Sequence, residues 1–210
     1  MARDVYVVTH AQSEHHVQGL VGGWYDSGLT ALGRRQADAI AERLAGLVAA
    51  APTELYASDL KRAAQTAEPI EARLGVKARL MSGLREKSFG VAGGHPNAWL
   101  DARFIRPPRE GDRLDHDEGV EGAETRRALL TRVFLAMDEI LASPCESLIV
   151  VTHGFALTAV VAAWFRLPIE ASGWIGFRPH SGGITHLAQD DRFFDRALLS
   201  FDDRAHLEGL

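Results

Sequence analysis

The chain has 210 residues, of which 46% are hydrophobic and 24% are charged. These values match an ordinary globular protein and exclude a chain that is mainly disordered, and the length suits a single α/β domain over residues 1–210. The formal net charge of -5 excludes a broadly basic surface, so we expect no nucleic-acid partner.

The single cysteine, Cys145, allows no internal disulfide and fits a reducing compartment. No apolar run reaches the length of a membrane span, and the first residues lead into a strand-like segment without the pattern of a signal peptide. We therefore expect a cytoplasmic protein with no membrane partner. Trp164, Trp174 and Phe177 suit either a core or an interface, which leaves a homo-oligomer open.

Short apolar runs recur along the chain and predict strands. Residues 5–9, 55–57 and 148–152 are typical of strands that are buried on both faces. Residues 184–188 and 197–201 flank a polar stretch, and this arrangement predicts a hairpin.

Between these strands lie segments whose apolar residues recur at helical spacing. This spacing is found in residues 30–50 after the N-cap candidate Thr30, from Ser58 onward, in residues 123–142, and from about Phe155 onward. Strands that alternate with helices predict an α/β three-layer sandwich, in which a mainly parallel central sheet carries helices on both faces.

The segment from about residue 87 to residue 118 breaks this alternation. It is rich in glycine, proline and charged residues, and its apolar residues show little periodicity. Long loops of this kind often cover or shape a binding site, so we interpret the segment as a lid or specificity excursion. The alternative is a surface insert with no part in function.

Two histidines occupy equivalent places in the sequence. Residues 7–10 and residues 150–153 both read Val-Val-Thr-His, which puts His10 and His153 where two buried strands end. Neighbouring parallel strands would bring both imidazoles to the edge at which α/β sheets bind ligands. Gly154 and a helix start follow His153, and the free N–H groups of a helix start favour an anion.

Two charged residues complete the candidate site. Arg62 lies in the first turn of a predicted helix, where a cation is unfavourable unless an anion is close, so a phosphate clamp is preferred to a solvated arginine. Glu86 follows another short apolar stretch. It could act as a general acid, and the alternative is an ordinary surface carboxylate. The adjacent His15 and His16 are only a faint metal signal, and we expect no metal and no cofactor.

The order of the motifs resembles a known family. These motifs are His10, Leu29-Thr30-x-x-Gly33, Ser58-Asp59-Leu60-x-Arg62-Ala63, Leu84-Arg85-Glu86 and His153-Gly154. Over about residues 5–206 the chain is similar to the histidine phosphatase superfamily, which includes cofactor-dependent phosphoglycerate mutases. The resemblance implies a phosphoglycerate mutase-like fold and a metal-independent phosphatase that acts on a small phosphorylated metabolite. It also implies a phosphohistidine at His10, phosphoryl binding by Arg62 and His153, and proton donation by Glu86.

One departure from the family pattern affects the site. The family signature Arg-His-Gly is replaced by Thr9-His10-Ala11, and losing a bidentate arginine contact costs roughly 1.5–3 kcal/mol. We expect another cation to fill the space, and His16 stands where the family usually has a phosphate-binding asparagine. The further candidates lie in or near the excursion: Arg85, Lys87, Arg103 and Arg106. The predicted phosphate-binding residues are Thr9, His16, Arg62, Arg85 and Gly154.

Two other functions stay open at this point. A phosphoglycerate mutase must exclude water from its phosphohistidine and usually carries a larger enclosing insertion than the thirty or so residues found here, which favours hydrolysis. A protein that only binds a phosphorylated ligand would not need a nucleophile together with an acid.

Overall fold

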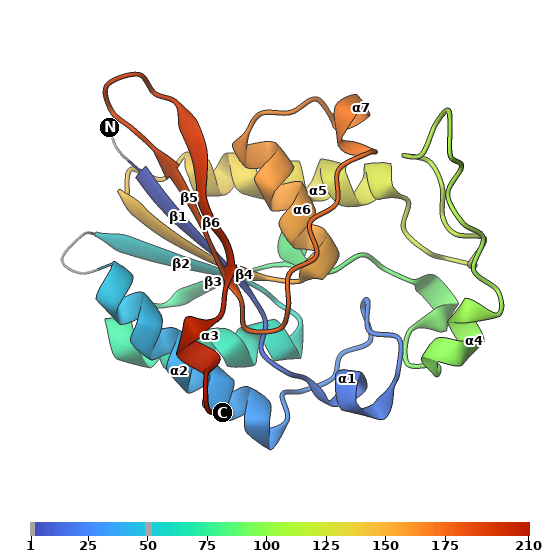
Figure 1. The fold of residues 1–210 in the computed structure, drawn as a ribbon, viewed down its shortest axis with the longest axis horizontal. Coiled ribbons are helices and arrows are strands. Elements are labelled where there is room, and N and C mark those ends of the chain that lie inside the picture. The colour runs from blue at the N-terminus through green and yellow to red at the C-terminus, as the bar shows by residue number, and fades with distance from the viewer. Residues whose placement is uncertain (1–2, 49–51) are drawn as a thin grey trace.

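The computed structural model describes residues 3–48 and 52–210 and is built around a six-stranded sheet (Figure 1). The strands follow the order β3-β2-β4-β1-β5-β6. β3, β2, β4 and β1 run parallel, and β5 and β6 form an antiparallel hairpin beside β1. The bounds are β1 (Arg3–Thr9), β2 (Thr53–Ser58), β3 (Ala78–Met81), β4 (Ser147–Thr152), β5 (Ile184–Gln189) and β6 (Arg196–Asp203).

Helices cover both faces of this sheet (Figure 1). The long ones are α2 (Ala31–Leu47) and α3 (Lys61–Leu74) on one face and α5 (Arg126–Leu141) and α6 (Gly154–Trp164) on the other. The short ones are α1 (Glu14–Gln18), α4 (Asn97–Asp101), α7 (Ile169–Ser172) and the 3₁₀ turns Ser82–Leu84, Gly90–Ala92 and Ala205–Leu207. No helix in the described ranges is both long and apolar enough for a transmembrane span. The predicted three-layer α/β sandwich is confirmed.

Side chains of the central strands alternate between two apolar cores. Val7 and Val150 pack in the core beneath α5 and α6, whereas Val8 and Val151 pack in the core beneath α2 and α3. All four side chains are fully buried. Burial on both faces explains why these strands read as continuous apolar runs and not as an apolar–polar alternation.

Some predicted boundaries differ from those in the structure. The helix expected from Ser58 begins at Lys61, because Ser58 is the last residue of β2 and Leu60 is the N-cap. Residues 49–50 of the helix expected over 30–50 lie outside the described residues. β3 has no counterpart among the predicted strands, since it is four residues long and its two central side chains are exposed.

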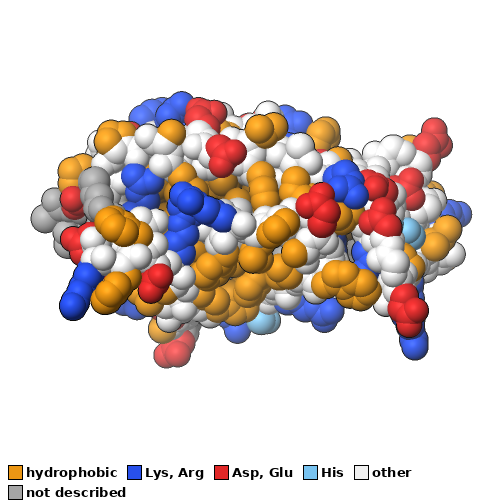
Figure 2. Space-filling model, turned by 90° about the horizontal axis from the view of Figure 1, so that it is seen from above, with side chains coloured by type: hydrophobic (Ala, Val, Ile, Leu, Met, Phe, Trp, Pro, Cys, Tyr) orange, Lys and Arg blue, Asp and Glu red, His pale blue; other side chains and the backbone are white. Residues whose placement is uncertain are grey.

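The excursion over residues 87–118 is tied to the rest of the molecule at both ends. The ammonium group of Lys87 forms an ion pair with the carboxylate of Glu118, and the two side chains are 2% and 13% exposed. Beneath the excursion, Val21, Ala92 and Val120 form a small buried apolar cluster. The excursion forms the right-hand end of the molecule in Figure 1, and Figure 2 shows acidic side chains concentrated at that end. Its ends are therefore fixed, although most of its length is irregular.

Gly33 sits where α2 begins and packs closely on the backbone of Gln12. A Cβ at Gly33 would lie 2.0 Å from the carbonyl oxygen of Gln12. We expect Gly33→Ala to lower the free energy of unfolding by about 1–3 kcal/mol, because the helix must move away from this backbone. Urea unfolding measures the change.

Gly46 in the same helix provides the matched control, since a Cβ there meets no atom within 4 Å. Gly46→Ala should leave stability unchanged or raise it by up to about 1 kcal/mol through helix propensity. Equal losses in the two variants would contradict the close approach at Gly33.

Candidate active site

The structure brings His10 and His153 together at the carboxyl ends of β1 and β4. These two strands are parallel neighbours in which Thr9 pairs with Thr152. The two imidazole centroids lie 5.0 Å apart, with the rings edge to face. The repeated Val-Val-Thr-His segments therefore place two histidines at one rim of the sheet.

His10 is held as a neutral imidazole whose Nε2 carries no proton. Its Nδ1 lies 2.8 Å from the carbonyl oxygen of Ala11, which can only accept, so Nδ1 carries the proton. Nε2 is then unprotonated and accepts a hydrogen bond from Nε of Arg62 at 3.2 Å. Burial, with the charge of Arg62 beside it, lowers the pKa of His10 well below its usual value. These features leave Nε2 available as a nucleophile at neutral pH.

Arg62 is buried and is oriented by backbone carbonyls. Nη1 donates to the carbonyl of Tyr25 at 3.0 Å and Nη2 donates to that of Gly23 at 2.7 Å, while the residue is 1% exposed. Burial lowers the pKa of Arg62 to about 10, so it stays charged at neutral pH. Asp26 accepts the N–H of Lys61 at 2.7 Å and supplies an anion at the start of α3.

Two buried polar atoms beside His10 have no partner in the described part of the chain. They are Oγ1 of Thr9 and Nδ1 of His153. Nε2 of His153 is already engaged by Oγ of Ser58 at 2.8 Å. Leaving buried polar atoms without partners is costly, so each is a candidate for a hydrogen bond to a ligand. Thr9 lines the cavity in front of His10, whereas His153 is fully buried and is not among the lining residues.

The carboxyl group of Glu86 occupies the start of α6. It accepts the N–H groups of Phe155 and Ala156 at 3.1 Å and that of Lys87 at 2.9 Å. The carboxyl group of Glu86 therefore occupies this helix start, which corrects the expectation that these N–H groups are free for phosphate. Burial raises the pKa of Glu86 against these hydrogen bonds, as a proton donor requires. Gly154 lines the cavity at the same point.

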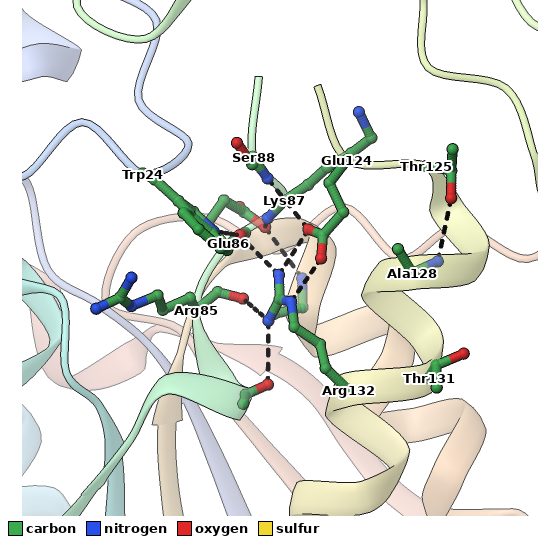
Figure 3. A network of polar contacts seen from close by, with 12 residues as sticks. Trp24, Arg85, Glu86, Lys87, Ser88, Glu124, Thr125, Ala128, Thr131 and Arg132 are labelled. Carbon is green, nitrogen blue, oxygen red and sulfur yellow. Dashed lines mark hydrogen bonds and ion pairs between the residues drawn. The ribbon is translucent and has the colours of Figure 1, made fainter. Parts of the chain in front are cut away.

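Arg132 of α5 fixes the backbone that carries Glu86 (Figure 3). Its guanidinium donates to the carbonyls of Gly83, Arg85 and Glu86 at 3.0, 2.7 and 2.8 Å. Glu124 accepts two further bonds from it, at 2.7 and 2.8 Å. The indole N–H of Trp24 donates to the Glu86 carbonyl at 2.7 Å. Arg132 thus acts on Glu86 through the main chain.

A cavity of about 400 Å³ lies in front of His10. His16 lines it with its ring stacked on that of His10, the centroids being 5.4 Å apart. His15 also lines it and is buried, with Nδ1 between the hydroxyls of Ser13 and Ser27 at 3.0 and 2.6 Å. The lining residues are Thr9, His10, His15, His16, Leu20, Gly22, Gly23, Arg62, Glu86, Phe89, Asn97, Gly154, Phe155, Pro179 and Ser181.

Several predicted cations do not reach this cavity. Arg85 forms a bidentate ion pair with Asp59, with two contacts of 2.7 Å, and lies over the Trp24 ring, so its predicted phosphate contact is not supported. Lys87 is paired with Glu118, and Arg103 lies over Trp99. Arg106 is exposed, and like the other three it is absent from the cavity lining. Within residues 3–48 and 52–210, no cluster of three or more His, Cys, Asp or Glu side chains is arranged to hold a metal ion.

Sequence reasoning missed three supporting residues: Ser58, Asp26 and Arg132. For Arg132 a signal is present, because it falls three residues after Leu129 and four before Ala136, both on the buried face of α5. A charged residue at that spacing needs a partner inside the molecule. Nothing in the sequence identifies backbone carbonyls as those partners.

Comparison with known proteins identifies the family of the chain. The family model of the histidine phosphatase superfamily (branch 1) matches residues 5–199. Glucosyl-3-phosphoglycerate phosphatase of Mycobacterium tuberculosis is 31% identical over 192 residues, which cover 87% of this chain and 82% of that protein. The probable phosphoglycerate mutase GpmB of Yersinia enterocolitica is 31% identical over 173 residues, covering 80% of this chain and 77% of that one.

Solved structures show the same architecture. Mycobacterial hydrolase 1 has a TM-score of 0.79 and 27% identity over 98% of this chain and 100% of that one. Mycobacterial glucosyl-3-phosphoglycerate phosphatase in complex with VO3 has a TM-score of 0.77 and 28% identity over 96% of this chain and 100% of that one. The chain belongs to the histidine phosphatase superfamily and has a phosphoglycerate mutase-like fold. It is an enzyme of the phosphatase type.

The buried histidines make stability depend on pH. Burial lowers the pKa of His10 and His153 well below the usual value and that of His15 to about 3. In the unfolded chain these groups titrate near pH 6.5, so below that pH the unfolded state binds more protons and unfolding becomes easier. The raised pKa of Glu86 acts in the opposite direction. We expect the free energy of unfolding to fall by roughly 2–4 kcal/mol from pH 7.5 to 5.5.

Urea unfolding at a series of pH values measures this slope. His15→Gln should flatten it by about one proton, because one buried neutral imidazole is removed. The exposed His95 is the control, and His95→Gln should leave the slope as it is. A free energy of unfolding that stays constant over this range would contradict the assignment of buried neutral histidines.

Proposed function

We propose that this enzyme hydrolyses phosphomonoesters of small metabolites through a phosphohistidine at His10. The observation that carries the proposal is the unprotonated Nε2 of His10, which lines the cavity beside the buried cation Arg62. Glucosyl-3-phosphoglycerate phosphatase, the relative named above, supports a phosphorylated metabolite as substrate.

The reaction proceeds in two displacements at phosphorus. Nε2 of His10 attacks, the bond from phosphorus to the leaving oxygen breaks, and protonated Glu86 gives its proton to that oxygen. Water then attacks the phosphohistidine and loses a proton to the Glu86 carboxylate, and the N–P bond breaks to release phosphate. Arg62 and the unpartnered atoms of Thr9 and His153 bind the phosphoryl oxygens. Positioned cations and hydrogen-bond donors are the main requirement of such transfers.

His16 takes the place of the missing signature arginine in this proposal. Its ring stacks on His10, it lines the cavity, and its Nδ1 lies 3.3 Å from Oγ of Ser13 and 3.4 Å from Oγ of Ser181. Partial burial and the charge of Arg62 lower the pKa of His16 when the site holds no anion. A phosphate dianion nearby raises that pKa, so His16 becomes a cation when substrate binds.

The phosphoenzyme tests this proposal. Rapid acid-free quenching with labelled aryl phosphate should trap an acid-labile, alkali-stable phosphoprotein that is missing in His10→Ala. His116, which bonds to the carbonyl of Ile105 and is absent from the lining of the cavity, serves as the control, and His116→Gln should retain the label. Label on a serine or aspartate would contradict the nucleophile. Interconversion of phosphoglycerates faster than phosphate release would favour a mutase, and tight phosphate binding without turnover would favour a binding protein.

The role of Glu86 predicts a dependence on the leaving group. Glu86→Gln should lower kcat/KM, which reports the transfer to His10 and not the later hydrolysis, at least about a hundred-fold with an alkyl phosphate, whose leaving oxygen needs a proton. With nitrophenyl phosphate, whose leaving group is stable as an anion, the loss should stay below about ten-fold. Asp59→Asn changes an acid that pairs with Arg85 outside the cavity and should affect both substrates alike. Equal losses for Glu86→Gln would show that Glu86 is not the proton donor.

A further inference from the structure

A second and larger cavity adjoins the one in front of His10. Its volume is about 610 Å³, against about 400 Å³ for the first. Both cavities are lined by Phe89, Gly154, Phe155 and Pro179, so they adjoin at that point. The volume is in the range of pockets that enclose a whole small-molecule ligand. A phosphoester held at His10 therefore has room to extend its alcohol part into this second space, which we call the leaving-group chamber.

The wall of the leaving-group chamber is mostly apolar. It combines side chains of the excursion, of α5 and α6, and of the segment that follows α7. The apolar lining residues are Phe89, Leu100, Phe104, Pro107, Leu129, Leu130, Phe155, Ala159, Ile175, Phe177 and Pro179. Figure 2 shows hydrophobic side chains gathered across the middle of the face viewed there.

The polar side chains of the chamber bond mainly to the protein itself. The hydroxyl of Thr158 is paired with the backbone of Phe177, and that of Ser172 donates to the carbonyl of Pro168 at 3.0 Å. Glu118 is paired with Lys87.

Three further charged residues line the chamber, namely Asp101, Arg126 and Arg178. Arg126 donates to the carbonyl of Gly173 at 2.6 Å. Asp101 and Arg178 occupy exposed positions. A ligand in the chamber therefore meets a mainly apolar wall, with hydrogen-bonding groups left at Asp101, Arg126 and Arg178.

This lining discriminates between kinds of alcohol. A sugar hydroxyl that enters without a partner loses its bonds to water, which weakens binding by roughly ten-fold for each group. A methylene group that enters leaves water for an apolar wall, which strengthens binding by about four-fold.

We propose that the leaving-group chamber selects phosphomonoesters of apolar alcohols, aromatic or aliphatic, over those of sugars. This inference rests on the function proposed for His10, because the chamber receives the alcohol part of the same substrate. It assigns the excursion a role in specificity through Leu100, Phe104 and Pro107.

A substrate series at constant leaving-group chemistry tests the proposal. Ethyl, butyl and hexyl phosphate release primary alcohols of similar acidity and differ in apolar length. We expect kcat/KM to rise about ten- to a hundred-fold from ethyl to hexyl phosphate, and glucose 6-phosphate to be hydrolysed more slowly than hexyl phosphate. A flat series, or faster hydrolysis of glucose 6-phosphate, overturns the proposal.

Two neighbouring exposed residues provide the matched variants. Phe104 lines the chamber and is 38% exposed, whereas Ile105 is 58% exposed and is absent from the lining. Phe104→Ser should lower kcat/KM for hexyl phosphate about five-fold or more and leave ethyl phosphate unchanged. Ile105→Ser should change neither, and inhibition by inorganic phosphate should be the same in both variants. Equal behaviour of Phe104→Ser and Ile105→Ser overturns the proposal.

The two proposals can fail separately. If every ester is hydrolysed through the His10 phosphoenzyme without preference for apolar length, the proposed reaction stands and the proposed specificity is wrong. If no ester yields a phosphohistidine, both the proposed reaction and the proposed specificity are wrong.

Discussion

The buried guanidinium of Arg62 is the interaction on which the rest of the site depends. It joins His10, the proposed nucleophile, to the carbonyls of Gly23 and Tyr25 in the segment between α1 and α2. A buried charge without such contacts would be strongly destabilising, so loop, helix α3 and strand β1 must keep this arrangement together. With burial as the main cause, the cation also lowers the pKa of His10, and it lines the cavity in front of that residue.

The surrounding groups form a site that is electrostatically incomplete without an anion. His10 and His153 are neutral because they are buried beside Arg62, and Glu86 has a raised pKa. In the proposed function, one phosphate group gives Arg62 a counter-ion, gives partners to Thr9 and His153, and favours protonation of His16. On that proposal the folded protein carries the cost of these buried polar groups, and substrate binding recovers it.

The general architecture could be predicted from the sequence because it follows from apolar periodicity. Continuous apolar runs gave β1 and β4, and the repeated Val-Val-Thr-His segments placed His10 and His153 on one rim. The contacts of Glu86 and Arg85 could not be predicted in this way. Glu86 binds the start of α6, seventy residues further on, and Arg85 turns to Asp59. Such pairings depend on how loops are arranged in space. The spacing of residue types along the sequence does not predict that arrangement.

The buried ion pair between Lys87 and Glu118 has a consequence for the evolution of this enzyme. It joins the two ends of the excursion, while His95 and Asn97 between them bond to the backbone after α1. Breaking a buried pair of this kind leaves one charge without a partner, which gives this end-to-end contact a high energetic barrier to change. On the specificity role proposed for the excursion, substitutions between these attachments can alter the apolar wall of the leaving-group chamber while His10 and Arg62 keep their positions.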